Sequence, residues 1–195
     1  MKQRKNGIKE YISLTLVIIT LAAALVWGFS ISASGDYGNG PFEPMPLEDL
    51  GPAPAFKLPD LQGGPVDSAD FKGDLILVNF WGSWCKSCCD EMPALEAAYQ
   101  KYKDRGFQLV AIAVEFDRTA EKRLAKATRK VEELGMTFTV VMGDDSVVKA
   151  FGGKPENFPQ TYLIDRKGNL RKAVVGAHEE AYWDRLIRTA LSEVR

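Results

Sequence analysis

The feature of this sequence that most constrains its fold is a pair of cysteines, Cys85 and Cys88, placed where a strand gives way to a helix. The run 75–80 before the pair is continuously apolar, which is typical of a strand buried on both faces. After it, apolar side chains recur at spacings of three and four, as on one face of a helix: Cys88, Met92, Leu95, Tyr99 and Tyr102. We therefore predict a Cys-x-x-Cys motif at the N-terminus of a helix over about 85–105.

This position gives the two cysteines different expected roles. The free N–H groups and the dipole at a helix N-terminus favour negative charge, and they lower a thiol pKa from about 8.5 to about 3.5–7.5. Cys85 lies off the apolar face, so we expect it to be exposed and to attack a disulfide sulfur. Cys88 lies on that face, so we expect it to be half-buried and to resolve the mixed disulfide. The alternatives are an inert structural disulfide and a zinc knuckle, but structural zinc normally needs four ligands.

Strands alternate with helices along the rest of the chain. Further strands are predicted at 107–116, 137–142, 162–165 and 170–175, and further helices at 119–134, 146–151 and 179–194. A short alternating segment, 56–58, is followed by the turn signal Gly63-Gly64. The order indicates an α/β fold: a mixed central β-sheet flanked by helices, with an N-terminal β-hairpin extension.

The N-terminal region predicts one transmembrane helix. Residues 1–10 are basic, and no charged residue occurs from Tyr11 to Gly35. The apolar part, 12–31, is long enough as a helix to span a bilayer core of ~30 Å. Because the basic residues all precede it, the positive-inside rule predicts a cytoplasmic N-terminus and a single-pass anchor over 11–33. The folded domain is then expected on the periplasmic, extracytoplasmic side of the inner membrane. The alternative is a cleaved signal peptide, because Ile31-Ser32-Ala33 is a passable cleavage site.

The remaining composition sets the domain limits and excludes some partners. Segment 34–50 is rich in glycine and proline and is predicted to be a linker, so the folded domain should occupy 51–195. The net charge of -1 gives no general electrostatic reason to bind nucleic acid. We expect a monomer without cofactor or metal.

The cysteine motif and its surroundings resemble a known family. Trp84-Cys85-x-x-Cys88 after an apolar strand looks like the thioredoxin fold, and further segments are similar to membrane-anchored thiol–disulfide oxidoreductases of the TlpA/ResA type: 52–56, 78–81 and 91–93. The lead-in 52–56 is shared with redoxin/AhpC-TSA proteins. The resemblance covers about 51–194 and implies reduction of protein disulfides, as in cytochrome c maturation. It also implies recharging by a membrane electron-donor thiol protein.

The resemblance also implies a substrate groove beside the cysteines. Pro159, ahead of a predicted strand, matches the cis-proline of the family. We expect this proline to lie against the cysteine pair. With it, Trp81, Trp84 and Phe158 are expected to shape a shallow apolar groove for an extended protein segment.

A base for Cys88 is harder to assign from sequence. Thioredoxin carries a buried aspartate six residues before its first active-site cysteine, but here that position is Asn79, whose amide cannot accept the proton. ResA-type members use an acid after the second core strand. Glu115 and Asp117 flank that position, and we prefer Glu115. The alternative is that Glu115 is a solvated loop acid.

A third cysteine, Cys89, leaves other functions open. We favour the interpretation that Cys89 packs in the core as a small hydrophobic residue. With Cys85 it also forms a Cys-x-x-x-Cys pair that resembles copper-delivering thioredoxin-like proteins, for which His178 could nominally supply a further ligand. A copper-binding chaperone is therefore one alternative function, and a thiol peroxidase, suggested by the lead-in, is another.

Overall fold

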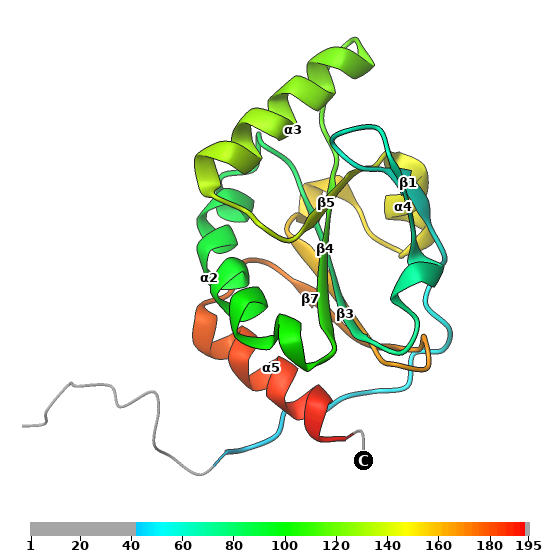
Figure 1. Cartoon of the computed structure of the whole chain (residues 1–195), viewed down its shortest axis with the longest axis vertical. Coiled ribbons are helices and arrows are strands. Elements are labelled where there is room, and N and C mark those ends of the chain that lie inside the picture. The colour runs from blue at the N-terminus through cyan, green and yellow to red at the C-terminus, as the bar shows by residue number, and fades with distance from the viewer. Residues whose placement is uncertain (1–41, 194–195) are drawn as a thin grey trace, which may run out of the picture. The chain divides into compact units, whose positions relative to one another are not determined.

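A mixed five-stranded sheet forms the centre of the part of the chain that the computed structural model describes, residues 42–193 (Figure 1). The strand order is β5-β4-β3-β6-β7, with these bounds: β3 Leu75–Trp81, β4 Phe107–Ala113, β5 Thr139–Met142, β6 Gln160–Ile164 and β7 Leu170–Val175. β3, β4 and β5 run parallel, whereas β6 pairs antiparallel with β3 and β7. Because β3 has a partner on each side and is buried along its whole length, it fixes the position of the chain that follows it.

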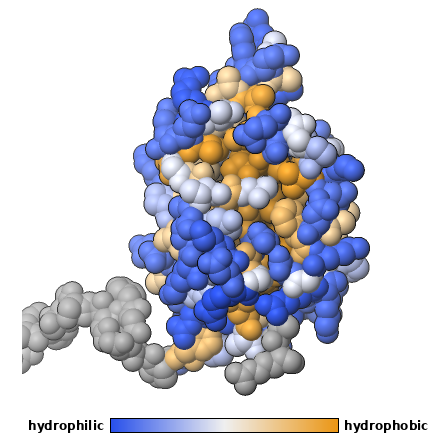
Figure 2. Space-filling view, in the orientation of Figure 1, coloured by the Kyte–Doolittle hydropathy of each residue, from blue (hydrophilic) through white to orange (hydrophobic). Residues whose placement is uncertain are grey.

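Helices cover both faces of this sheet. The α-helices are α2 Lys86–Tyr102, α3 Ala120–Leu134, α4 Asp145–Ala150 and α5 Glu180–Ser192, and the short 3₁₀ helices are η1 Ser68–Phe71, η2 Lys103–Arg105 and η3 Pro155–Asn157. Helices α2, α3 and α5 lie on one face, and α4 lies on the other (Figure 1). Figure 2 shows apolar residues in the middle of the face in view, over the sheet, with hydrophilic residues around them. The predicted α/β architecture is confirmed.

The predicted N-terminal hairpin is also present. β1 (Lys57–Pro59) and β2 (Pro65–Asp67) pair antiparallel as a separate two-stranded sheet. The carboxylate of Asp60 closes the turn by accepting the backbone N–H groups of Gln62 at 2.8 Å and Gly64 at 2.7 Å. This local side-chain acceptor explains why the hairpin forms at this point.

Strand β4 is shorter than the sequence predicts, and the difference matters for the site. We predicted a strand over 107–116, but β4 ends at Ala113. Its partner β3 ends at Trp81, and just beyond the paired residues Val114 N donates to Trp81 O at 2.8 Å. Glu115 and Phe116 therefore belong to a loop.

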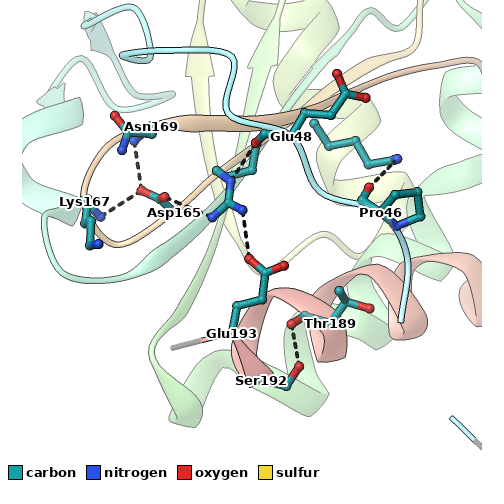
Figure 3. A network of polar contacts seen from close by, with 10 residues as sticks. Pro46, Glu48, Asp165, Lys167, Asn169, Thr189, Ser192 and Glu193 are labelled. Atoms are coloured by element: carbon teal, nitrogen blue, oxygen red, sulfur yellow. Dashed lines mark hydrogen bonds and ion pairs between the residues drawn. The ribbon is translucent and has the colours of Figure 1, made fainter. Parts of the chain in front are cut away.

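The segment 42–50, the later part of the predicted linker, has no helix or strand but lies against β7 and α5 (Figure 3). Its backbone exchanges hydrogen bonds with β7, among them Glu48 N to Arg171 O at 2.9 Å. The Arg171 guanidinium donates back to Glu48 O at 2.7 Å and pairs with Glu193 at 2.9 Å. The hydrogen-bonded part of the chain thus begins before residue 51.

The predicted anchor, 11–33, lies outside the described residues. No helix within residues 42–193 combines the length and the apolar character needed to cross a membrane.

Candidate active site

Cys85 and Cys88 form a disulfide at the start of α2. Their Cα atoms are 5.3 Å apart, and Cys85 is the N-cap residue of the helix. The Cys85 sulfur accepts the N–H of Cys88 at 3.2 Å. A sulfur at this position receives a free helix N–H group, which would stabilise its thiolate in the reduced protein. The sequence therefore located the pair and the start of the helix correctly.

The burial of the two cysteine residues corrects the sequence-based expectation. Cys85 is 7% exposed and Cys88 is 0% exposed, so the relative order was right but both residues are more deeply buried than expected. The disulfide holds the Cys85 sulfur against the first turn of α2, which accounts for its burial. Cys85 is still the more accessible of the two, as its assignment as nucleophile requires.

The turn before the cysteines depends on a glycine. A Cβ atom on Gly82 would overlap the ring of Trp84 and the carbonyl oxygen of Val114. The absence of a side chain at Gly82 therefore lets the chain turn from β3 into α2 while Trp84 packs over it.

The loop that carries Pro159 lies beside this turn. The Phe158–Pro159 peptide bond is cis, as predicted, and the Pro159 carbonyl accepts the N–H of Gly176 at 2.9 Å. The ring of Phe158 stacks on that of Trp84, with centroids 6.0 Å apart. Of the predicted groove residues, Trp84, Phe158 and Pro159 are thus brought together.

Trp81 is not part of this surface, and its prediction was wrong. Its side chain is 0% exposed. Side chains alternate along a strand, so Trp81 shares the face of β3 that carries Asn79. Because Asn79 contacts Glu91 on α2, that face lies under the helix and Trp81 is a core residue.

Glu115 lies beside the turn that precedes Cys85. It is 5% exposed, and its two carboxylate oxygens accept the Ser83 N–H at 2.6 Å and the Ser83 hydroxyl at 2.8 Å. Among the described residues neither oxygen is hydrogen-bonded to a cysteine. The solvated-loop alternative is wrong, since the side chain is buried and fully engaged. The other candidate, Asp117, pairs with Lys126 at 3.0 Å.

The sequence analysis missed a second buried acid, Glu91. It follows Cys88 by three residues on α2, so the two side chains are neighbours on one helix face. Glu91 is 2% exposed, and burial raises its pKa to about 7, although hydrogen bonds from the His178 N–H at 2.8 Å and from Asn79 at 3.4 Å act in the opposite direction. The sequence did contain a sign of this buried acid, because Glu91 is a charged residue between Cys88 and Met92 on the helix face that was predicted to be buried.

Asn79 completes the buried polar cluster. It is 0% exposed, and its Nδ2 donates to Thr161 Oγ1 at 2.9 Å as well as to Glu91. Its Oδ1 has no hydrogen-bond partner among the described residues. Thioredoxin has a buried aspartate where this chain has Asn79. Here the buried carboxyl group beside that position belongs to Glu91, which accepts from the Asn79 amide.

Neither the Cys89 thiol nor the His178 ring is hydrogen-bonded to Cys85, Cys88 or Glu91 in the described part of the chain. Cys89 is half-buried and not fully buried as expected, and this burial still raises the pKa of its thiol, which donates to the Ser83 carbonyl at 3.9 Å. His178 reaches Glu91 through its backbone N–H, and its ring stacks on Tyr182 with centroids 3.9 Å apart. Within residues 42–193, no three His, Cys, Asp or Glu side chains are grouped so as to hold a metal ion.

Comparison with known proteins gives consistent matches. The model of the AhpC/TSA family matches residues 51–173. The thiol-disulfide oxidoreductase ResA of Geobacillus thermodenitrificans (strain NG80-2) is 34% identical over 163 residues, which cover 83% of this chain and 85% of that protein. ResA of Bacillus subtilis (strain 168) is 33% identical over 130 residues, 66% of this chain and 68% of that protein.

Solved structures show the same relationship. A thiol:disulfide interchange protein of the thioredoxin family from Chlorobium tepidum TLS superposes with a TM-score of 0.64 and 31% identity, covering 72% of this chain and 95% of that one. A putative thioredoxin from Neisseria meningitidis gives a TM-score of 0.62 and 36% identity, with 73% and 91% covered.

Proposed function

The chain belongs to the AhpC/TSA family and, within it, to the ResA-like thiol–disulfide oxidoreductases of thioredoxin fold, and on this basis we propose that it reduces disulfides of protein substrates outside the cytoplasm. The observation that carries the proposal is the Cys85–Cys88 disulfide at a helix N-terminus, with the cis-proline loop packed beside it. This arrangement can exchange a dithiol for a disulfide without any cofactor.

The reaction takes place in two exchanges. The Cys85 thiolate attacks one sulfur of the substrate disulfide, and the other substrate sulfur leaves as a thiolate and takes up a proton. The Cys88 thiolate then attacks the Cys85 sulfur of the mixed disulfide and displaces the second substrate thiol. Two electrons pass to the substrate, and the product state of the protein is the disulfide that the structure contains.

Glu91 is our candidate for the base that takes the proton from Cys88. It lies one helical turn from Cys88 in the same buried layer, and its pKa of about 7 lets it accept or release a proton near neutral pH. Glu115, the acid preferred from sequence, has both oxygens occupied by Ser83 and is a weaker candidate.

We place the domain outside the cytoplasm, tethered by a helix over 11–33 in the cytoplasmic membrane. The support is the basic segment 1–10 followed by the uncharged stretch from Tyr11 to Gly35. A membrane thiol protein would then return electrons to the Cys85–Cys88 disulfide. The substrates that we propose are proteins whose disulfides are reduced during cytochrome c maturation.

The tether is tested by expressing the full chain and fractionating the cells. We expect the protein to sediment with membranes, to resist extraction by carbonate and to keep its first 30 residues by mass spectrometry. A soluble protein that begins near Ser34 would show a cleaved signal peptide instead.

The exchange mechanism is tested by trapping. In Cys88→Ser the second exchange cannot occur, so mixed disulfides with substrate should accumulate on Cys85 and be found there by peptide mass spectrometry. The matched control is Cys88→Ser combined with Cys85→Ser, which should trap nothing. Adducts found on Cys89 in place of Cys85 would contradict the assignment of the nucleophile.

A further inference from the structure

Two exposed aromatic side chains, Trp84 and Phe116, lie against each other next to the disulfide. Trp84 is 44% exposed and Phe116 is 54% exposed, and their ring centroids are 5.0 Å apart. Phe158 packs on Trp84 as well, with centroids 6.0 Å apart, but is itself buried. We call Trp84 and Phe116 the aromatic platform. The other large apolar side chains that are comparably exposed among residues 42–193 are Leu50 and Val175.

Hydrogen bonds fix the indole ring of Trp84 and the backbone of the loop that carries Phe116. Trp84 Nε1 donates to Val114 O at 2.9 Å, so the indole ring is tied to the loop that carries Phe116. The carboxylate of Glu115 ties the same loop to Ser83 through two bonds, and Lys126 Nζ donates to Phe116 O at 3.1 Å. Aromatic rings that are already fixed lose little conformational entropy on binding, which is typical of residues that contribute strongly to an interface.

The chemistry of the reaction determines what reaches this surface. A substrate cysteine must come within bonding distance, ~2.05 Å, of the sulfur of Cys85, the residue directly after Trp84. An extended chain advances ~3.3 Å per residue, so side chains one or two residues from that cysteine lie within reach of the two rings. The two acids that flank Phe116 are both engaged, Glu115 with Ser83 and Asp117 with Lys126 at 3.0 Å. An apolar side chain that packs on the two rings therefore need not displace either carboxylate from its partner.

We propose that the aromatic platform binds a large apolar side chain located within two residues of the reactive cysteine of the protein substrate, and that Phe116 sets this preference. This inference rests on the proposed function and specifies its substrate class. It also gives Glu115 a role, since the Glu115 carboxylate positions the loop from which Phe116 projects. Loss of the contact between the Phe116 ring and such a side chain should lower kcat/KM about tenfold.

The test uses the full-length protein in detergent and a set of peptides, each with one cysteine in a mixed disulfide with glutathione. Dithiothreitol returns two electrons to the Cys85–Cys88 disulfide after each turnover, and the rate without protein is subtracted. In four of the peptides a single phenylalanine stands two or one residues before, or one or two residues after, the cysteine, at a different position in each peptide. In the fifth peptide all four of these positions are serine. We expect kcat/KM for the best phenylalanine peptide to exceed that for the serine peptide about tenfold, and Phe116→Ala to reduce this ratio to near one.

Matched variants separate recognition from folding. Leu50→Ala removes a side chain of similar exposure, 44%, that lies beside Leu170 at the start of β7, away from the cis-proline loop at the other end of the strand, and should keep the wild-type ratio. Glu115→Ala should lower the ratio by releasing the loop. Glu115→Gln should retain it, because an amide can accept the Ser83 N–H and donate to the Ser83 hydroxyl.

Four outcomes would count against the proposed function or the platform, and they are distinguishable. If wild type reduces none of the five peptides, the proposed function fails. If it reduces all of them with equal efficiency, or if Phe116→Ala keeps the preference, only the platform proposal is overturned. A dimer of the wild type that is lost in Phe116→Ala, without any peptide preference, would show that the platform binds a second copy of the chain.

Discussion

Replacing Cys85 with serine should abolish the reduction of protein disulfides, on the order of a thousandfold or more, whereas replacing Cys89 with serine should change the rate by about twofold at most. The Cys85 sulfur accepts a free helix N–H group, which favours its thiolate, although Cys85 is less exposed than the half-buried Cys89. Cys89 has a thiol pKa raised by burial, so it supplies little thiolate near neutral pH. Reduction of insulin, followed by the precipitation of its free B chain, measures both variants.

The two variants are a matched pair, because each replaces one thiol with a hydroxyl and the two positions are four residues apart at the start of one helix. Thermal unfolding of both proteins shows whether either change acts through stability. If Cys89→Ser loses as much activity as Cys85→Ser while remaining folded, Cys89 takes part in the exchange and the two-cysteine mechanism is wrong. Retention of activity in Cys85→Ser would likewise require another nucleophile.

The parts of the site that the sequence predicted are those fixed by local pattern. The apolar run before Cys85 and the spacing after it place the cysteines at a strand-to-helix junction, and the structure has the junction there. Pro159 directly precedes β6, as its position ahead of an apolar run indicated. The order of strands and helices could be predicted for the same reason, because apolar residues repeat with a different period in strands and in helices.

The parts that were missed depend on packing between distant segments. Trp81 was assigned to the groove because it is close to Cys85 in sequence, but the alternation of side chains along β3 sends it into the core. Glu91 is a polar residue on an apolar helix face, and its partners are supplied by β3 and by the loop before α5, 12 and 87 residues away. A single sequence gives no direct sign of such partners.

Glu91 also makes stability depend on pH in a predictable direction. Its pKa is about 7 in the folded protein, compared with an ordinary value of 4.5, so between these two pH values the folded state binds more protons than the unfolded state. The free energy of unfolding should therefore fall as the pH rises from 4.5 to 7, by about 3 kcal/mol in total from this group. Glu91→Gln should remove this part of the slope, whereas Glu132→Gln, at an exposed position on α3, should not. Urea unfolding of the oxidised protein at several pH values measures the slope.

The same substitution should slow the second exchange of the reaction. If the Glu91 carboxylate takes the proton from Cys88, resolution of the mixed disulfide in wild type should accelerate as the pH rises through about 7, and Glu91→Gln should lose that rise and be slower by about a hundredfold. The chain's one histidine, His178, also faces this region, so His178→Phe is the matched control. It retains the backbone N–H to Glu91 and an aromatic ring on Tyr182, and it should keep the rise. Stopped-flow measurement of mixed-disulfide decay separates this step from the first attack. A Glu91→Gln profile that still rises through pH 7 would show that the proton from Cys88 goes to water or to another group.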